Sequence, residues 1–358
     1  MANGIVGEMT RAAILPFPAD PFLINFWIKG FKNIWHDEVD RLYIYCNSPI
    51  EKSVIDFIQE VTKDEKVAFL YNPQQVPHGA AINDALNFVM EDLVMLIEDD
   101  AFILRHGVIS ECFRMLESGR YNLVASPRGS CSFEILKRGA ELWGDTDTGA
   151  GDNGCNFWPN FLFAPKQTLI ETDRNFDSKC WKAGTYIEPL QTSFDVDVVG
   201  DTLVNTSLQL RAKIPSHRIL IIPQFHSYVT DVDDYHAQRY IFDGKCPWFH
   251  VGSLSSGVSG VLMDDQGRSL SRRFTADPTG ETKLPPHCNT PQEKQEWQRR
   301  VAWWLTFYEE APNTLPEFRA AYGAAVERVI AQYALSRKTI TTRQTIFKKI
   351  MKGYYDQL

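Results

Sequence analysis

The stretch LVMLIEDD, Leu93 to Asp100, places five consecutive apolar residues directly before three acids. An unbroken apolar run such as Leu93 to Ile97 is typical of a strand that is covered on both faces at the centre of a sheet. Three carboxylates at the end of such a strand are costly unless something positive lies beside them. The stretch therefore predicts a buried central strand that ends at a polar, functional edge.

The segments before this strand alternate between strand and helix. Strands are predicted at Ala12 to Phe17, Arg41 to Cys46 and Val67 to Tyr71. Helices are predicted at Pro21 to Trp35, Glu51 to Val61 and Ala80 to Met90. Strands that alternate with helices of this length indicate right-handed crossovers. We expect an α/β fold with a largely parallel, Rossmann-like central sheet, helices on both of its faces, and ligands at the carboxyl ends of the strands.

The later segments are less regular. Short strands are predicted at Leu123 to Ser126, Phe161 to Ala164 and Arg218 to Pro223, with a helix at Thr202 to Ala212. The residues from Asp231 to Pro286 are rich in Gly, Ser, Asp and Pro and predict mostly loop. Beyond Pro291, aromatic and aliphatic residues at steps of three and four indicate helices. We divide the chain into a main domain at 10–255, a loop-rich connection at 256–290 and a C-terminal helical region at 291–358.

Composition restricts the class of protein. Apolar residues make up 44% of the chain and charged residues 23%, as in soluble globular proteins. No apolar run is long enough to span a bilayer. The seven cysteines are scattered and never spaced as C-x-x-C, which indicates reduced thiols and a cytoplasmic protein. The net charge of −8 gives no overall attraction to nucleic acid, although the C-terminal tail is locally basic at Arg337, Lys338, Arg343, Lys348, Lys349 and Lys352.

The acidic triplet itself suggests a metal site. Side chains alternate in direction along an extended chain, so Glu98 and Asp100 point to one side and Asp99 to the other. Two carboxylates on one side form a hard-oxygen site suited to Mn²⁺ or Mg²⁺. Such an ion neutralises a diphosphate leaving group. The alternative is an acidic strand end that caps the next helix or is simply solvated.

The sequence LVMLIEDDAFI resembles the DxD segment of GT-A glycosyltransferases. The resemblance implies a nucleotide-diphosphate sugar as donor, Asp100 as metal ligand, and Glu98 and Asp99 in contact with the donor or the metal shell. HGAAINDAL, His78 to Leu86, is similar to a helix that lies near the donor nucleotide in that superfamily, with Asn83 as the matching polar residue. Four further positions fall where such enzymes hold the base and ribose: Pro16, Phe17, Asp20 and Asn47.

The resemblance also implies a general base. In an inverting transfer a carboxylate takes the proton of the acceptor hydroxyl. The succession of an acid, a helix, an Arg and a strand in GDTLVNTSLQLRAKIPSHRILIIP matches the family's order and makes Asp201 the candidate base, with Asp197 as runner-up. An aspartate before a helix is also an ordinary N-cap, so capping alone remains the alternative.

Two histidines compete to complete the metal shell. His226 follows a predicted strand at the position where the family places its histidine. His250 lies in WFHVGSLSSG, where Ser253 and its neighbouring glycines and serines are suited to bend around phosphates. GAGDNGCNFWPN, Gly149 to Asn160, is polar and aromatic, as expected of an acceptor loop.

These patterns predict a metal-dependent, inverting glycosyltransferase. The leading acceptor hypothesis is a hydroxymethylated pyrimidine in DNA, as for viral enzymes of this fold, which would then work in the host cytoplasm. The alternatives are transfer to a glycan or polysaccharide and a non-catalytic carbohydrate-binding protein. A sugar-nucleotide pyrophosphorylase is disfavoured, because AAILPFPADPF lacks that family's Gly-rich loop with its Arg and Pro-Lys pair. The sequence does not indicate an oligomeric state.

Overall fold

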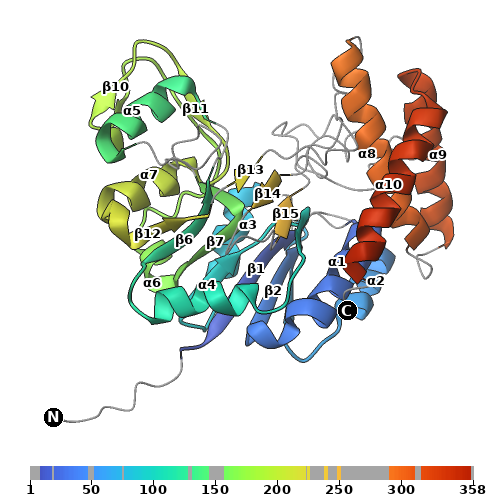
Figure 1. Ribbon diagram of the computed structural model, residues 1–358, viewed down its shortest axis with the longest axis horizontal. Coiled ribbons are helices and arrows are strands. Elements are labelled where there is room, and N and C mark those ends of the chain that lie inside the picture. The colour runs from blue at the N-terminus through green and yellow to red at the C-terminus, as the bar shows by residue number, and fades with distance from the viewer. Residues whose placement is uncertain are drawn as a thin grey trace.

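A seven-stranded sheet forms the centre of the molecule (Figure 1). The computed structural model describes residues 9–17, 20–46, 52–74, 76–127, 131–144, 157–222, 224–225, 238–240, 248–250, 290–310 and 316–355. Within these residues the strands follow the order β12-β6-β7-β4-β1-β2-β3. Their bounds are β1 Arg11–Phe17, β2 Arg41–Cys46, β3 Val67–Tyr71, β4 Leu93–Leu96, β6 Leu123–Pro127, β7 Phe157–Pro165 and β12 Ile219–Ile221.

The sheet is largely parallel, as the sequence predicts. β1 pairs in parallel with β2 and β4, β2 with β3, and β12 with β6. β7 runs antiparallel between β4 and β6. The four residues of β4 are all buried, which agrees with a central strand covered on both faces. The expected fold class is therefore confirmed.

Helices cover both faces of the sheet, so a hydrophobic core lies on each face. Side chains alternate along β1, and alternate residues therefore point into opposite cores. Ala13, Leu15 and Phe17 belong to one hydrophobic cluster, with α1, α2 and α4, whereas Ala12 and Ile14 belong to a second, with α3, α6 and α7. The bounds of these helices are α1 Pro21–Gly30, α2 Lys52–Thr62, α3 His78–Leu86, α4 Val108–Glu117, α6 Lys166–Ile170 and α7 Val204–Lys213. α1 continues as a π-helical turn, Phe31–Trp35, and a 3₁₀ turn, His36–Glu38.

A second, antiparallel sheet lies beside the end of β4. It has the order β13-β14-β15-β5, with β5 at Ala101–Ile103, β13 at Gln224–Phe225, β14 at Gln238–Tyr240 and β15 at Trp248–His250. β14 and β15 correct the prediction of loop in this part of the chain. Each is only three residues long, too short for an alternating pattern to stand out from a Gly- and Ser-rich background.

A small group of elements forms a third hydrophobic cluster near β6 and α7. It contains α5 Phe133–Trp143, the 3₁₀ turn Glu188–Leu190, β8 Lys179–Trp181 and β11 Val198–Gly200, which pairs antiparallel with β8. The two-stranded sheet of β9 Tyr186–Ile187 and β10 Thr192–Ser193 lies between β8 and β11 in the chain. In Figure 1 this group and the strands β13 to β15 lie at the same end of the central sheet.

Three C-terminal helices, α8 Pro291–Glu310, α9 Pro316–Gln332 and α10 Arg337–Tyr355, pack beside α1 (Figure 1). Phe22 of α1 meets Tyr322 with ring centroids 4.4 Å apart, and Phe26 meets Phe307 at 5.2 Å. The predicted C-terminal helical region therefore shares one core with the sheet. None of the described helices is both long and apolar enough to cross a bilayer.

Several predicted boundaries shift. β7 begins at Phe157, so the last residues of the expected acceptor loop belong to a strand of the central sheet. α7 begins at Val204 and not at Thr202, because Leu203 adopts a left-handed conformation with φ of 70°. α3 begins at His78, two residues before its predicted start, and ends at Leu86.

Candidate functional site

The acidic triplet forms a turn between the two sheets. Ile97 donates its N–H to the carbonyl of Ile14 and still extends the central sheet, and Ala101 N–H donates to the carbonyl of Glu98 at 3.2 Å. β5 then begins at Ala101 and pairs with β15. The turn is thus held by a sheet on each side, which keeps its three carboxylates at the carboxyl edge of β4.

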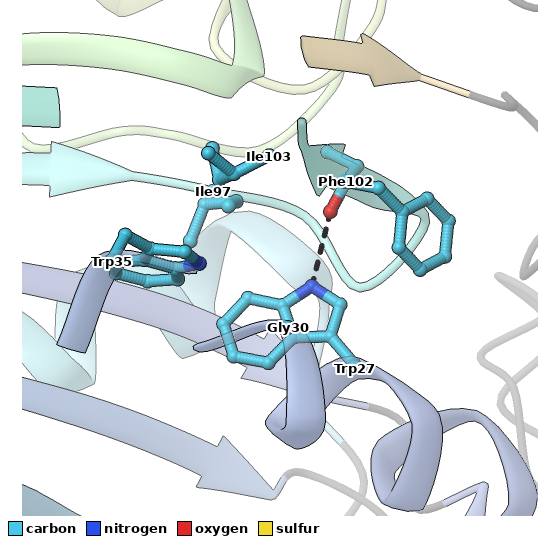
Figure 2. A pocket seen from close by; sticks show the side chains of 7 residues that line it. Trp27, Gly30, Trp35, Ile97, Phe102 and Ile103 are labelled. Carbon is cyan, nitrogen blue, oxygen red and sulfur yellow. Dashed lines mark hydrogen bonds between the residues drawn. The ribbon is translucent and has the colours of Figure 1, made fainter. Parts of the chain in front are cut away.

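A hydrogen bond from Trp27 holds the end of the same turn. The Trp27 indole N–H donates to the carbonyl of Ala101 at 3.1 Å, and Trp27 helps to line a small pocket with Trp35, Ile97 and Ile103 (Figure 2). An indole N–H usually finds a partner when it is buried, and here that partner is the residue next to Asp100. The apolar pocket therefore supports the acidic turn structurally and is not itself a ligand site.

The cluster formed by Glu98, Asp100 and His250 is the central feature of the site. His250 Nε2 lies 3.0 Å from Asp100 Oδ1 and 3.2 Å from Glu98 Oε2. One ligand atom from each residue lies within 4.8 Å of the others. β-strand pairing explains the arrangement, because His250 stands opposite Ala101 in the register of β15 and β5. The structure places His250, one of the two candidate histidines, beside these acids, and His226 lies outside the described residues.

The imidazole is charged in this arrangement. Burial disfavours the charged form of His250, but the carboxylates of Asp100 and Glu98 outweigh burial and raise the pKa of His250 to about 10. His250 is 1% exposed and Asp100 3%, so little water screens the interaction. A protonated histidine here takes the place that a cation would otherwise occupy between the two acids.

The donor set fits a hard divalent cation. Carboxylate oxygens from Glu98 and Asp100 with one imidazole nitrogen are ligands that suit Mn²⁺ and Mg²⁺. Glu98 Oε2 is buried and has no aligned hydrogen-bond donor among the described residues, so it has capacity for a further ligand. Asp99 is also buried, at 3% exposed.

His78 is a residue of this site that sequence reasoning did not select. Its Nδ1 lies 3.7 Å from Glu98 Oε1, and the side chain is about one third exposed. A single histidine at a helix start carries no distinctive pattern. α3 follows the edge strand β3 and packs over β1 and β2, which brings its start toward the end of β4.

The predicted base, Asp201, is exposed and lies between β11 and α7. Its Oδ1 accepts only the N–H of Thr202, at 2.8 Å, among the described residues, so the carboxylate is not committed to a helix cap. The runner-up, Asp197, forms a surface ion pair with Lys182 Nζ at 2.7 Å, which together with the N–H of Ala183 lowers the pKa of Asp197. The lowered pKa makes Asp197 a poor proton acceptor.

Main-chain and side-chain contacts connect the Asp201 loop to α3, whose first residue, His78, lies beside Glu98. Leu203 N–H donates to the carbonyl of Phe176 at 2.7 Å. Phe176 lies against Gly79, where an added Cβ would come within 2.2 Å of the Phe176 carbonyl carbon. Asp177 Oδ1 accepts the N–H of Ala80 at 3.0 Å. Since His78 precedes Gly79, three successive contacts, Leu203 with Phe176, Phe176 with Gly79 and His78 with Glu98, connect the Asp201 loop to the Glu98 side chain.

The other residues predicted to contact the nucleotide sugar have partners within the fold. Pro16 and Phe17 end β1, and the Phe17 ring is fully buried in the core. Asp20 caps α1 by accepting the N–H groups of Phe22 and Leu23. Asn83 accepts from Arg174 Nε at 2.7 Å, which holds the 174 segment against α3. Donor contacts by these four residues remain predictions.

Three further predicted residues, Asn47, Ser253 and His226, lie outside the described residues, as does most of the expected acceptor loop.

A second group of acids and a histidine has a structural explanation. Glu38 is buried, and its two oxygens accept the N–H groups of Gly107 and Ser110, each at 2.7 Å, at the start of α4. His106 Nδ1 lies 2.9 Å from the carbonyl of Ile34. This hydrogen bond is the main reason that the pKa of His106 is raised. These contacts connect α4 to the turn after α1.

Solved structures with some similarity to this chain include a mannosyltransferase and two synthases. The mannosyltransferase PcManGT from Pyrobaculum calidifontis in complex with GDP-Man and Mn²⁺ matches over 98% of this chain and 84% of its own, with 11% identity and a TM-score of 0.41. Glucosyl-3-phosphoglycerate synthase from Mycobacterium tuberculosis with Mn²⁺, UDP-Glc and glycerol 3-phosphate matches over 60% and 69%, with 17% identity and a TM-score of 0.36. 4-Diphosphocytidyl-2C-methyl-D-erythritol synthase from Anaerococcus prevotii matches over 47% and 75%, with 10% identity and a TM-score of 0.32.

No protein-family model matches the sequence, and no curated protein matches it. TM-scores below 0.5 do not define the activity of this chain, so its function has to be argued from the site.

Proposed function

We propose that the chain is a metal-dependent, inverting glycosyltransferase of the GT-A type that uses a nucleotide-diphosphate sugar as donor. One observation carries the proposal: Glu98, Asp100 and His250 converge at the carboxyl edge of the central strand β4, with their ligand atoms within 4.8 Å of one another. This edge is where open α/β sheets bind nucleotides. The resemblance of LVMLIEDDAFI to the DxD segment supports the same assignment.

The residues have separate roles in this mechanism. Glu98, Asp100 and His250 hold Mn²⁺ or Mg²⁺, and the bound ion would neutralise the diphosphate of the donor. Asp201 accepts the proton of the acceptor hydroxyl, because its carboxylate is exposed and lacks an ion-pair partner among the described residues. The contacts through Phe176 and Gly79 hold the Asp201 loop in a defined position relative to α3.

The acceptor hypotheses differ in their electrostatic requirements. A DNA acceptor needs cations to contact phosphates. In the basic tail, Arg337 is paired with Glu327, Lys348 is paired with Glu309, and Arg343 is 4% exposed. The charge available for phosphates is therefore smaller than the sequence suggests. This observation favours the glycan alternative over the hydroxymethylated pyrimidine of DNA.

Two substitutions test the division of roles. Asp100→Ala should abolish Mn²⁺-dependent donor binding, whereas Asp201→Asn should bind the donor and fail to transfer the sugar. Calorimetry with Mn²⁺ and nucleoside diphosphates measures the first effect, and a transfer assay with GDP-mannose and UDP-glucose as the first donors measures the second. Transfer by Asp201→Asn at the wild-type rate would show that the base lies elsewhere.

Mass spectrometry of hydroxymethylated oligonucleotides and of oligosaccharides, incubated with the enzyme and mixed nucleotide sugars, separates the two acceptor classes. A mass increment on the oligonucleotides alone would support DNA. Failure of the wild-type chain to bind Mn²⁺ or any nucleoside diphosphate would contradict the whole proposal.

A further inference from the structure

Two exposed apolar residues lie on the segments that adjoin the Asp201 loop. Phe133, the first residue of α5, is 72% exposed, and Val199 of β11 is 51% exposed. Single exposed apolar residues are common on protein surfaces and need no explanation. These two differ because hydrogen bonds attach the segments that carry them to each other, and Asp201, which has no ion-pair partner among the described residues, comes two residues after Val199.

Hydrogen bonds fix the relation between α5 and β11. Ser132 N–H donates to the carbonyl of Val199 at 2.8 Å, and Val199 N–H donates back to Ser132 Oγ at 2.8 Å. Cys131 and Gly200 form an isolated antiparallel bridge next to this pair. A serine before a helix normally uses its hydroxyl to cap that helix, but Ser132 makes no such cap and uses the hydroxyl on the strand. The start of α5, and with it Phe133, is thereby attached to β11.

Asp201 follows the same strand directly. In β11, Val198 and Gly200 are buried and Val199 is exposed. Asp201, which is also exposed, comes directly after Gly200, the last residue of the strand. An aromatic ring, an aliphatic side chain and the predicted base therefore lie on adjoining segments.

We propose that Phe133 and Val199 are the acceptor platform of the enzyme, and that the acceptor presents the apolar face of an uncharged sugar ring. This inference rests on the proposed function. One face of a sugar ring consists mainly of C–H groups, which pack on an aromatic ring, while the hydroxyls at its rim remain accessible. A ring that lies on Phe133 can direct one rim hydroxyl toward Asp201.

The charges around the platform support an uncharged ring over a polyanion. Glu134 follows Phe133 in α5, and Asp195 and Asp201 are exposed on either side of Val199 in the chain. The nearby Lys182 is already paired with Asp197. Lys137, one turn along α5 from Phe133, is an exposed cation, but the three carboxylates outnumber it, so a neutral sugar is favoured over phosphate groups.

The test measures the KM for the acceptor, and the ratio of sugar transfer to donor hydrolysis, in variants of Phe133. Methyl glycosides and oligosaccharides serve as acceptors, and a hydroxymethylcytosine oligonucleotide is included in parallel. We expect Phe133→Ala to raise the acceptor KM by about tenfold to a hundredfold, the range that the loss of one buried aromatic contact produces. The ratio of transfer to donor hydrolysis should fall with it. Phe133→Tyr retains the ring and should restore most of the affinity, and Val199→Ser should give a smaller rise in KM.

Phe88 provides a matched control. It is 54% exposed and follows α3, whose C-terminal end lies at the opposite edge of the sheet because the helix runs back from the carboxyl end of β3. Phe88→Ala removes the same side chain from the surface and should leave acceptor KM unchanged. An equal KM for Phe133→Ala and Phe88→Ala would overturn the platform.

Other outcomes separate this inference from the proposed function. Donor hydrolysis by the wild-type enzyme without transfer to any glycoside would overturn the sugar-ring acceptor, and so would transfer to the oligonucleotide alone. The absence of both donor hydrolysis and Mn²⁺-dependent donor binding would instead overturn the proposed glycosyltransferase. Circular dichroism of Phe133→Ala, whose exposed ring contributes little to folding, confirms that a changed KM does not reflect unfolding.

Discussion

At the scale of single residues, the site depends on a charge balance between two acids and one histidine. Asp100 and Glu98 raise the pKa of His250 to about 10, so His250 is protonated at neutral pH in the metal-free protein. A metal ligand must be neutral imidazole. A cation and a proton therefore compete for the same nitrogen.

We predict that Mn²⁺ binding releases about one proton per site near pH 7.5, because the ion replaces the proton on His250. Calorimetric titration in buffers of different ionisation enthalpy measures the number released. The same competition means that the apparent affinity for Mn²⁺ should increase as pH rises toward 10. An affinity that is constant between pH 6 and pH 9, with no proton release, would show that His250 does not bind the ion.

The raised pKa of His250 also makes the stability of the folded protein depend on pH. A folded-state pKa above the unfolded value of about 6.5 stabilises the metal-free protein below pH 6.5. This stabilisation is lost as the pH rises through about 10. Added Mn²⁺ should reduce the pH dependence, since it supplies the positive charge that the proton otherwise provides.

At the scale of elements, the close approach of α3 to the 176 segment connects the two halves of the site. Gly79 has no space for a side chain, because a Cβ would lie 2.2 Å from the Phe176 carbonyl carbon. The neighbour is backbone, which cannot rotate away as a flexible side chain can. α3 is therefore placed by contact with a loop that is distant in the sequence.

We predict that Gly79→Ala lowers the free energy of unfolding by about 1–3 kcal/mol or more, because the backbone must move to accept the methyl group. The change should also weaken Mn²⁺ binding, since it displaces His78 from Glu98. Gly323→Ala is the control: in α9 its Cβ would approach only the Tyr308 hydroxyl, at 3.3 Å, and helix propensity favours alanine by about 0.5–1 kcal/mol. Chemical denaturation of both variants measures the difference, and equal stabilities would contradict the role of Gly79.

The elements differ in how far local sequence predicted them. β2 and β3 have the bounds that their apolar runs indicate, although β2 is buried and β3 is a partly exposed edge strand. The start of α7 was misplaced by two residues, since nothing in the sequence signals a positive φ at a leucine. β5 and β15 were missed because their pairing depends on each other and not on a local pattern.

At the scale of the whole molecule, the C-terminal helices are part of the site's support. Trp303 of α8 stacks on Phe347 of α10, with ring centroids 4.3 Å apart. It also lies parallel to Phe102 of β5 at 6.4 Å. Since Phe102 is two residues beyond Asp100, the helical region contacts the strand that positions the proposed metal ligands.

We predict that Trp303→Ala destabilises the fold by about 3–5 kcal/mol, the usual cost of removing a buried tryptophan. It should also weaken Mn²⁺ binding, because β5 loses its contact with α8. Tyr186→Ala, which removes an aromatic ring that is 63% exposed, should change stability by less than about 0.5 kcal/mol. Thermal unfolding with and without Mn²⁺ measures both effects. Unaltered Mn²⁺ affinity in a folded Trp303→Ala protein would show that the helices act on stability alone.

The sequence by itself determined the α/β class, the central strand β4 and the acids that end it. Apolar periodicity is a local property, and a continuous apolar run must be buried wherever it lies. Only the tertiary structure decided that His250 stands beside Glu98 and Asp100, that His78 approaches Glu98, and that the start of α5 is attached to β11. These contacts join segments that are far apart in the chain. Bringing such segments together costs loop-closure entropy, and the whole folded core, rather than any local pattern, offsets that cost.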